Sequence, residues 1–150
     1  MRIVVQLVKQ ASVSVDEKVI SEIKKGYLIL LGIETEDTQE DINWLAGKIA
    51  RLRIFGDENA VMNKSIIDVN GDVIIVSQFT LQAKTKKGNR PSYIKAARPE
   101  IASVLYNKFI LQLENEIGKK IQTGKFGATM DVSLINEGPV TIFMDSKNKY

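Results

Sequence analysis

The chain has 150 residues, enough to bury one hydrophobic core, with 44% apolar residues, 26% charged residues and a formal net charge of +3. It contains neither cysteine nor histidine, which excludes disulfides, Ser-His-Asp and Cys-His nucleophile systems, and thiolate or imidazole zinc sites. The apolar stretches are too short to cross a membrane, so we expect a cytoplasmic protein, and no residue pattern calls for a metal or cofactor.

The first part of the chain predicts several strands. Residues 2–8 and 12–15 are typical of β-strands, and the pair Asp16-Glu17 is expected to turn the chain into a further strand at 19–23. Residues 27–33 are almost uninterruptedly apolar. We therefore expect 27–33 to form a central strand that is covered on both faces.

A first helix is predicted after Thr38. Thr38 followed by Asp41 resembles an N-cap with an acidic first turn. Apolar residues then recur at helical spacing over about four turns: Ile42, Leu45, Ala46, Ile49 and Leu52. Residues 56–70 have few periodic apolar side chains and predict a loop with at most a short strand or turn, whereas 72–78 predict another strand.

The second half of the chain predicts one more helix and three more strands. Residues 84–91 hold the strongest local cluster of positive charge and predict an exposed loop. An apolar stripe over 101–117, ended by Gly118, predicts the helix. The three strands are expected at 120–125, 131–136 and 140–145. We therefore expect one mixed α/β domain, residues 1–145, followed by a short frayed tail, 146–150.

Two short polar motifs lie at the ends of predicted strands. They are Ser77-Gln78-Phe79-Thr80-Leu81 and Asn136-Glu137-Gly138-Pro139-Val140-Thr141. Each brings small hydroxyls, an amide and backbone groups to a strand end, where sites made mostly of main chain are common. Singly, each has a plainer interpretation: the hydroxyls can bond turn backbone, and Gly138-Pro139 can be an ordinary turn. The basic loop can likewise be an ordinary solvated loop.

Together, the motifs resemble those of the D-aminoacyl-tRNA deacylase family, also called D-tyrosyl-tRNA(Tyr) deacylases. The resemblance covers nearly the whole chain and includes Leu30-Leu31-Gly32-Ile33, Arg90-Pro91-Ser92, Gly124-Lys125-Phe126-Gly127 and the two motifs above. It implies an α/β fold, a compact three-layer β/β/α domain with mixed sheets and two main helices. It also implies a homodimer with each active site at the subunit interface.

The family resemblance implies an activity. Family members hydrolyse the ester bond of D-aminoacyl-tRNA, and also that of glycyl-tRNA mischarged on tRNA(Ala), as a chiral proofreading step in translation. The implied catalytic residues are Ser77, Gln78, Phe79 and Thr80, which would hold the terminal adenosine and the ester. Gly138-Pro139, carried in cis, would enter the partner subunit's pocket and exclude an L side chain by steric clash. The implied substrate-binding residues also include Asn136, Phe126 and Met130.

Two further inferences concern tRNA contacts and one departure from the family pattern. Four residues of the basic loop would meet acceptor-stem phosphates without reading bases: Lys84, Lys86, Lys87 and Arg90. In the family an arginine usually follows the glutamine of the first strand and braces the Gly-Pro element, but here Leu7 follows Gln6. Arg2, Arg53 and Lys9 are the candidates to replace it.

The implied chemistry suits a chain without histidine. An aminoacyl ester is already activated, so a site needs only to position water or the ribose 2′-hydroxyl and to stabilise the oxyanion with backbone N–H groups. We favour Thr80 as a positioning or hydrogen-bonding group. Its rival role as a covalent nucleophile lacks an identifiable general base. The alternative function is a non-catalytic RNA- or DNA-binding module that keeps the same fold.

Overall fold

The structure is a computed structural model that describes all residues, 1–150. Its main sheet has six strands. Five of them follow the order β2-β1-β3-β6-β7, and the sixth, β8, also pairs with β1. The strands are β1 (Arg2–Val15), β2 (Lys18–Ile23), β3 (Gly26–Gly32), β6 (Asp72–Ser77), β7 (Gln122–Thr123) and β8 (Asp131–Asp145). β1 is antiparallel to β2, β3 and β8, whereas β3, β6 and β7 are mutually parallel, so the sheet is mixed as expected.

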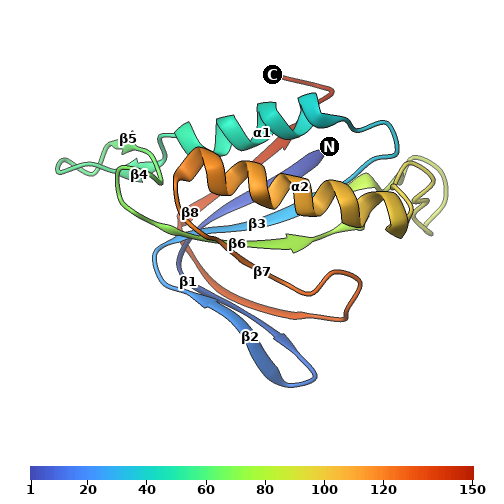
Figure 1. Ribbon diagram of the computed structural model, residues 1–150, viewed down its shortest axis with the longest axis horizontal. Coiled ribbons are helices and arrows are strands. Elements are labelled where there is room, and N and C mark those ends of the chain that lie inside the picture. The colour runs from blue at the N-terminus through green and yellow to red at the C-terminus, as the bar shows by residue number, and fades with distance from the viewer.

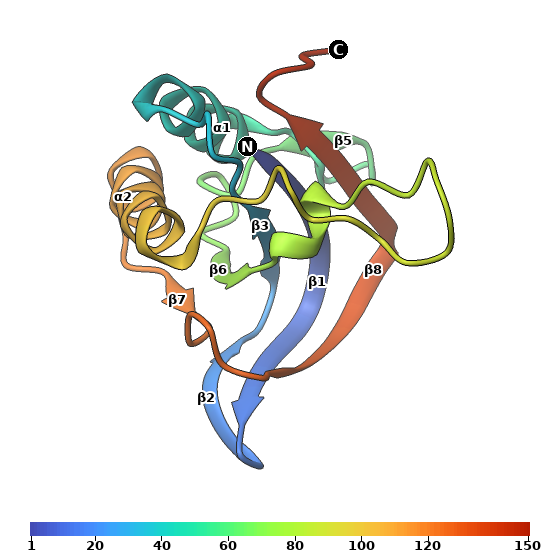
Figure 2. The same ribbon diagram turned by 90° about the vertical axis from the view of Figure 1, so that its right-hand side faces the viewer.

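Two strands are longer than the sequence pattern predicts. Residues 2–8 and 12–15 belong to the single strand β1, and 131–136 and 140–145 belong to the single strand β8. The pairing of β8 with β1 shifts register on either side of Val8, and both strands curve along their length (Figure 2). Because these two strands curve, the sheet extends from beneath the helices and continues as a second layer.

Both predicted helices are present, and both lie on one face of the sheet (Figure 1). Helix α1 spans Gln39–Arg51 and begins with the expected capping box between Thr38 and Asp41. Helix α2 spans Pro99–Ile117 and ends at Gly118 in the left-handed conformation that favours glycine. The predictions of both helices, of the start of α1 and of the end of α2 are confirmed.

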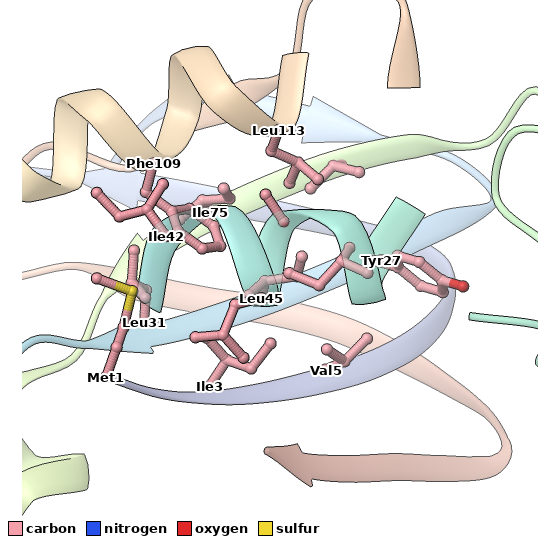
Figure 3. Close-up of a cluster of buried hydrophobic side chains, with 14 of the residues drawn as sticks. Met1, Ile3, Val5, Tyr27, Leu31, Ile42, Leu45, Ile75, Phe109 and Leu113 are labelled. Carbon is pink, nitrogen blue, oxygen red and sulfur yellow. The ribbon is translucent and has the colours of Figure 1, made fainter. Parts of the chain in front are cut away.

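The core has two parts because strands β3 and β6 are apolar on both faces. Tyr27, Leu31 and Ile75 point towards the helices, where they pack with Ile3 and Phe109 (Figure 3). The second cluster, on the other face of β3 and β6, is closed by the curved strands: Val8, Ala11, Val13, Ile23, Leu28, Ile74 and Val76. Helices, central strands and curved strands thus form the predicted three-layer β/β/α arrangement.

Residues 56–70 are mostly loop with a short strand, as expected: β5 (Met62–Lys64) pairs with β4 (Phe55–Gly56) in a short hairpin. Two local predictions need correction. The strand predicted at 120–125 is reduced to β7. The tail is not frayed at its start, since Ser146 is buried and its backbone N–H donates to the Met1 carbonyl oxygen.

Neither helix combines the length and apolar character that a membrane crossing requires.

Candidate active site

A cavity of about 550 Å³ opens where β6 ends. Its lining is mostly apolar: Leu31, Ile33, Val76, Ser77, Gln78, Phe79, Ala96, Ala97, Pro99, Ala102, Phe126, Gly127, Ala128, Met130 and Val132. Five of the residues that the sequence singled out therefore meet here. They come from two segments about fifty positions apart in the chain, which the parallel pairing of β6 with β7 brings to the same edge of the sheet.

The first motif leaves β6 and turns at once into a short 3₁₀ helix, η1 (Phe79–Gln82). The Gln78 N–H still donates to the Leu31 carbonyl oxygen at 2.8 Å, which ties the turn to β3. Gly32 makes the close approach of η1 possible, because a Cβ atom there would lie 2.7 Å from the Leu81 Cβ. The backbone of the motif is thus held against the end of β3.

Gln78 and Thr80 are linked directly. The Gln78 side-chain Nε2 donates a hydrogen bond to the Thr80 Oγ1 at 2.5 Å. Because this bond occupies a lone pair of the hydroxyl oxygen, the Thr80 hydroxyl hydrogen is left to be donated to another acceptor. Thr80 is half-buried and does not line the cavity itself, but it directly follows Phe79, which does.

An aromatic pair stands at the mouth of the cavity. The Phe79 side chain is 57% exposed, and its ring meets the ring of Tyr93 edge-on with centroids 5.0 Å apart. Tyr93 was not predicted from the sequence, because it lies beyond the basic loop in a segment without periodic pattern. A large exposed aromatic residue at a cavity mouth can offer its face to a flat ligand such as a nucleobase.

Phe126 and Met130 also line the cavity. Phe126 packs against Tyr106 with ring centroids 5.5 Å apart, and the buried Tyr106 hydroxyl donates to the Ile75 carbonyl oxygen at 2.9 Å. Burial raises the pKa of Tyr106 to about 12, so this hydroxyl stays protonated at neutral pH and serves as a structural tie. Met130 lies close above Gly124, where a Cβ atom would come within 2.6 Å of its sulfur.

No ionisable side chain lines the cavity, and nowhere in the chain do three His, Cys, Asp or Glu side chains gather with metal-binding geometry. The polar groups available inside are the Ser77 hydroxyl, the Gln78 amide and main-chain atoms. Such a lining can hold an uncharged ligand and can stabilise developing negative charge by hydrogen bonding. It holds no side chain suited to general-base catalysis at neutral pH.

The second motif lies outside this cavity. Gly138 and Pro139 are exposed at a bulge of β8 opposite Leu7, and the peptide bond between them is cis. Gly138 has a φ of 120°, a backbone conformation that favours glycine. Neither residue lines the cavity formed by Ser77, Gln78 and Phe79, so the single chain does not bring the two motifs together.

Asn136 holds the bulge in shape. Its side-chain Nδ2 donates to the Leu7 carbonyl oxygen at 3.2 Å and to the Val140 carbonyl oxygen at 3.0 Å, so one amide spans the Gly-Pro segment and joins it to β1. The sequence indicated Asn136 as a substrate-binding residue. In the structure its side-chain N–H groups are engaged within the protein.

The three candidate replacements for the missing arginine do not take that role. Leu7 is 6% exposed and belongs to the helix-side core. Arg2 donates to the Asp145 carboxylate at 2.8 Å and to the Leu81 carbonyl oxygen at 2.9 Å, which ties η1 to the end of β8. Arg53 donates hydrogen bonds to Asn63, and no hydrogen bond or ion pair links Lys9 to the bulge. The bracing amide of Asn136 was not foreseen from the sequence.

The basic loop follows η1 directly and projects from the body of the molecule in yellow-green (Figure 2). Lys84 and Ser92 exchange two backbone hydrogen bonds, of 2.8 and 3.0 Å, that close its base. All four predicted basic residues are exposed, and none forms an ion pair. The prediction of an exposed, positively charged loop beside the first motif is confirmed.

The chain is similar to proteins of one family. The model of the family described as D-Tyr-tRNA(Tyr) deacylase matches residues 4–145. A D-aminoacyl-tRNA deacylase of Flavobacterium psychrophilum is 66% identical over 149 residues, which cover 99% of both chains. Another protein of that name, from Flavobacterium johnsoniae, is 64% identical over 149 residues and 99% of both chains.

Two solved structures share the fold. One, titled c-Myc DNA Unwinding Element Binding Protein, matches with a TM-score of 0.90 and 43% identity over 97% of this chain and 98% of that one. The other, described as a probable eukaryotic D-amino acid tRNA deacylase, has a TM-score of 0.82 over 95% of this chain and 97% of that one. At 17% identity, the second likeness concerns the fold alone.

Proposed function

The chain belongs to the D-Tyr-tRNA(Tyr) deacylase family, an ester hydrolase family, and we propose that the cavity at the end of β6 is where it cleaves its substrate. Its reaction is the hydrolysis of the ester that joins a D-amino acid to tRNA. In the proposed arrangement the 3′-terminal adenosine rests against Phe79, and the aminoacyl ester enters between Ser77 and the wall of Phe126 and Met130.

The observation that carries the proposal is a cavity with hydrogen-bonding groups but no ionisable side chain. An aminoacyl ester needs no strong base, because it is already activated towards attack by water. Water adds to the carbonyl carbon, backbone N–H groups and the Thr80 hydroxyl stabilise the oxyanion, and the ribose oxygen leaves with a proton relayed through the neighbouring 2′-hydroxyl. The substrate thus contributes the proton relay that the protein lacks.

The same proposal assigns Thr80 a non-covalent role. A threonine nucleophile needs a neighbouring base to take its proton, and the Thr80 hydroxyl receives a hydrogen bond from the Gln78 amide, which cannot act as a base. With its oxygen engaged as an acceptor, the hydroxyl is oriented to donate. A donor of this kind suits the carbonyl oxygen of the ester.

Chirality would be read by the second motif across a homodimer interface. Gly138 and Pro139 are exposed and lie away from the cavity of their own chain, an arrangement that suits insertion into a partner's cavity. Backbone atoms pressed against the substrate α-carbon would clash with an L side chain and leave room for a D side chain or for glycine. Glycyl-tRNA mischarged on tRNA(Ala) is therefore included among the proposed substrates.

The basic loop completes the proposed substrate site. Its four basic side chains form no ion pair, and they follow the first motif, which lines the cavity, closely in sequence. They suit acceptor-stem phosphates, because recognition of phosphates requires positive charge but no reading of bases. A substrate charged during protein synthesis places the enzyme beside the translation machinery in the cytoplasm.

A second candidate function is nucleic-acid binding without hydrolysis. It is favoured by one observation, the 43% identical structure that is named as a DNA-binding protein. A pure binding module would bind charged tRNA and leave its ester intact.

One experiment separates these functions. Purified protein is incubated with D-tyrosyl-tRNA and with L-tyrosyl-tRNA, and the remaining ester is measured over time. Loss of the D ester alone supports the deacylase site and its chiral selection. Loss of both at the same rate contradicts the proposed Gly-Pro wall, and binding with no loss of either ester favours the binding module.

A further inference from the structure

A groove on the outer face of α1 concentrates positive charge and shares no lining residue with the cavity. It encloses about 420 Å³ and is lined by Trp44, Lys48, Arg51 and Arg53, together with three uncharged residues. No carboxylate lines it. The small residue Gly47 lies at its floor, and a Cβ atom there would come within 2.3 Å of the Arg51 Nη2, so the absence of a side chain lets the Arg51 guanidinium lie low across the helix.

The C-terminal segment brings another cation to the Trp44 ring, which lines this groove. The Ser146 hydroxyl donates to the Asp41 carboxylate at 2.6 Å, and the Lys147 ammonium binds the same carboxylate at 2.8 Å. These contacts fix the chain beside α1. Lys149 then lies over the Trp44 ring, 5.0 Å from its centroid, while Lys48 approaches the ring at 5.9 Å.

Most of this charge is not neutralised within the protein. Lys48 and Lys149 form no ion pair, and Arg53 bonds only to the backbone and side-chain oxygens of Asn63. Arg51 pairs with Glu116 at 2.9 Å, but the Arg51 side chain remains 70% exposed. Cations held close together around an aromatic ring repel one another, so a ligand with several negative charges would be attracted to them.

We propose that this groove, with Trp44, Lys48, Arg51 and Arg53 in its lining and Lys149 over the Trp44 ring, binds phosphates of the tRNA body beyond its acceptor end. The identity of the ligand rests on the proposed function, while the charge of the groove does not. A second copy of this chain is a poor occupant, because it would bring the same positive charge. Helices α1 and α2 lie on the same face of the sheet (Figure 1). Pro99 of α2 lines the cavity and α1 carries most of the groove, so one RNA arm can follow that face from the cavity to the groove.

The groove contains its own probe. Trp44 is the single tryptophan of the chain, so intrinsic tryptophan fluorescence reports on this site alone. The test variant is Lys48→Ala with Lys149→Ala, which removes two cations beside that ring. The matched control is Lys18→Ala with Lys24→Ala, which removes two exposed lysines at the two ends of β2 that line neither the cavity nor the groove.

The first measurement is binding of uncharged tRNA, followed by Trp44 emission and by filter retention at several salt concentrations. We expect tRNA to change the emission of the parent and of the control. The test variant should bind several-fold more weakly, and its log-log salt slope should be shallower by up to about two ions, one for each lost phosphate contact. Equal affinity and slope in the parent and the test variant would overturn the proposal, as would an equal loss in the control.

The second measurement separates the groove from the catalytic site. D-tyrosyl-adenosine contains the ester and the terminal nucleoside but no phosphate. The test variant should hydrolyse this compound at the parental rate while its KM for full-length D-tyrosyl-tRNA rises. A parallel loss on both substrates would show a general structural effect and contradict the proposal. If the parent failed to cleave D-tyrosyl-adenosine, the proposed cavity would be wrong, yet the binding experiment would still decide on the groove.

Discussion

The Gln78 amide donates a hydrogen bond to the Thr80 hydroxyl oxygen at 2.5 Å, and this pair sets the expected behaviour of the proposed catalytic segment, residues 77–81. If Thr80 is a hydrogen-bond donor to the ester, Thr80→Val should slow single-turnover deacylation by about ten- to a hundredfold, the effect of losing one bond to a developing charge. Thr80→Ser keeps the hydroxyl and should remain close to the parental rate. An acyl-enzyme trapped on Thr80 would contradict this role.

A second variant tests whether the Gln78 amide orients the Thr80 hydroxyl towards the substrate. In Gln78→Glu the carboxylate can only accept, so it would draw the Thr80 hydrogen towards itself and away from the substrate. The loss of rate should approach that of Thr80→Val. The double variant should lose little more than either single variant, because both changes remove one interaction. Additive losses would show that Gln78 and Thr80 act independently.

Gly138 provides a test of subunit cooperation. Its φ of 120° disfavours any other residue, and a Cβ atom there would come within 2.8 Å of the Val140 side chain, so Gly138→Ala should displace the bulge and inactivate the enzyme. If each site combines a cavity with its partner's bulge, mixing Gly138→Ala with Thr80→Val subunits should rebuild intact sites. Random exchange of subunits would restore about a quarter of the parental sites.

The mixing experiment has a definite alternative outcome. If the two motifs served the same chain's site, no mixture of the two variants would contain an intact site, and activity would stay at the level of the separate variants. A fully active monomer in sedimentation would also contradict the shared site. Mixing Thr80→Val subunits with themselves is the control for the exchange procedure.

Asn136 is expected to govern discrimination between enantiomers. In Asn136→Ala the Gly-Pro segment loses its ties to the Leu7 and Val140 carbonyl oxygens, so the bulge should become mobile. We expect slower hydrolysis of D-tyrosyl-tRNA and measurable hydrolysis of L-tyrosyl-tRNA, with the ratio of the two kcat/KM values falling at least tenfold, or about 1.4 kcal/mol. An unchanged ratio would remove Asn136 from the selectivity mechanism.

The basic loop should affect binding more than chemistry. Replacing Lys84, Lys86, Lys87 and Arg90 with alanine should raise the KM for charged tRNA and flatten its dependence on salt, because each lost phosphate contact reduces counterion release by about one ion. Turnover at saturating substrate should change little. Steady-state kinetics at several salt concentrations measures both quantities, and an unchanged salt slope would make this loop an ordinary solvated one.

Stability in acid should depend on Asp41. Burial would raise the pKa of Asp41, but hydrogen bonds from Lys147, Ser146 and the Thr38 backbone outweigh it and hold the pKa well below its usual range. Because the folded-state pKa is depressed, the stabilisation is present above the unfolded pKa of about 4 and is lost as the pH falls towards the folded value. Asp41→Asn should therefore lower the free energy of unfolding by about 1–3 kcal/mol at neutral pH.

The stability difference should shrink in acid. Urea unfolding of the parent and of Asp41→Asn, measured from pH 7 down to about pH 2, should give curves that converge as the parental carboxylate becomes protonated. Asp72 is a suitable control, since its side chain is about half exposed and its ion pair with Lys119 lies at the surface. A constant difference across the pH range would mean that the charge of Asp41 is unimportant.

The sequence by itself determined most of the secondary structure and the first half of the site. Helix ends depend on local contacts, so the Thr38–Asp41 capping box and the left-handed Gly118 could be recognised from neighbouring residues alone. The strand 27–33 was evident because both of its faces are apolar. The position of the first motif could be predicted in the same way, because a polar segment directly after a buried strand must lie at the edge of the sheet.

Tertiary structure decided what depends on contacts between distant residues. The pairing with β1 joins two predicted strands into β8, and the Gly-Pro bulge lies opposite Leu7 because of that pairing. Tyr93 reaches Phe79 only through the path of the intervening loop. The Asn136 brace and the tail that carries Lys149 to Trp44 likewise join segments with no local pattern between them. Periodicity reports the face on which a residue lies, whereas the partner it meets depends on how the whole chain closes upon itself.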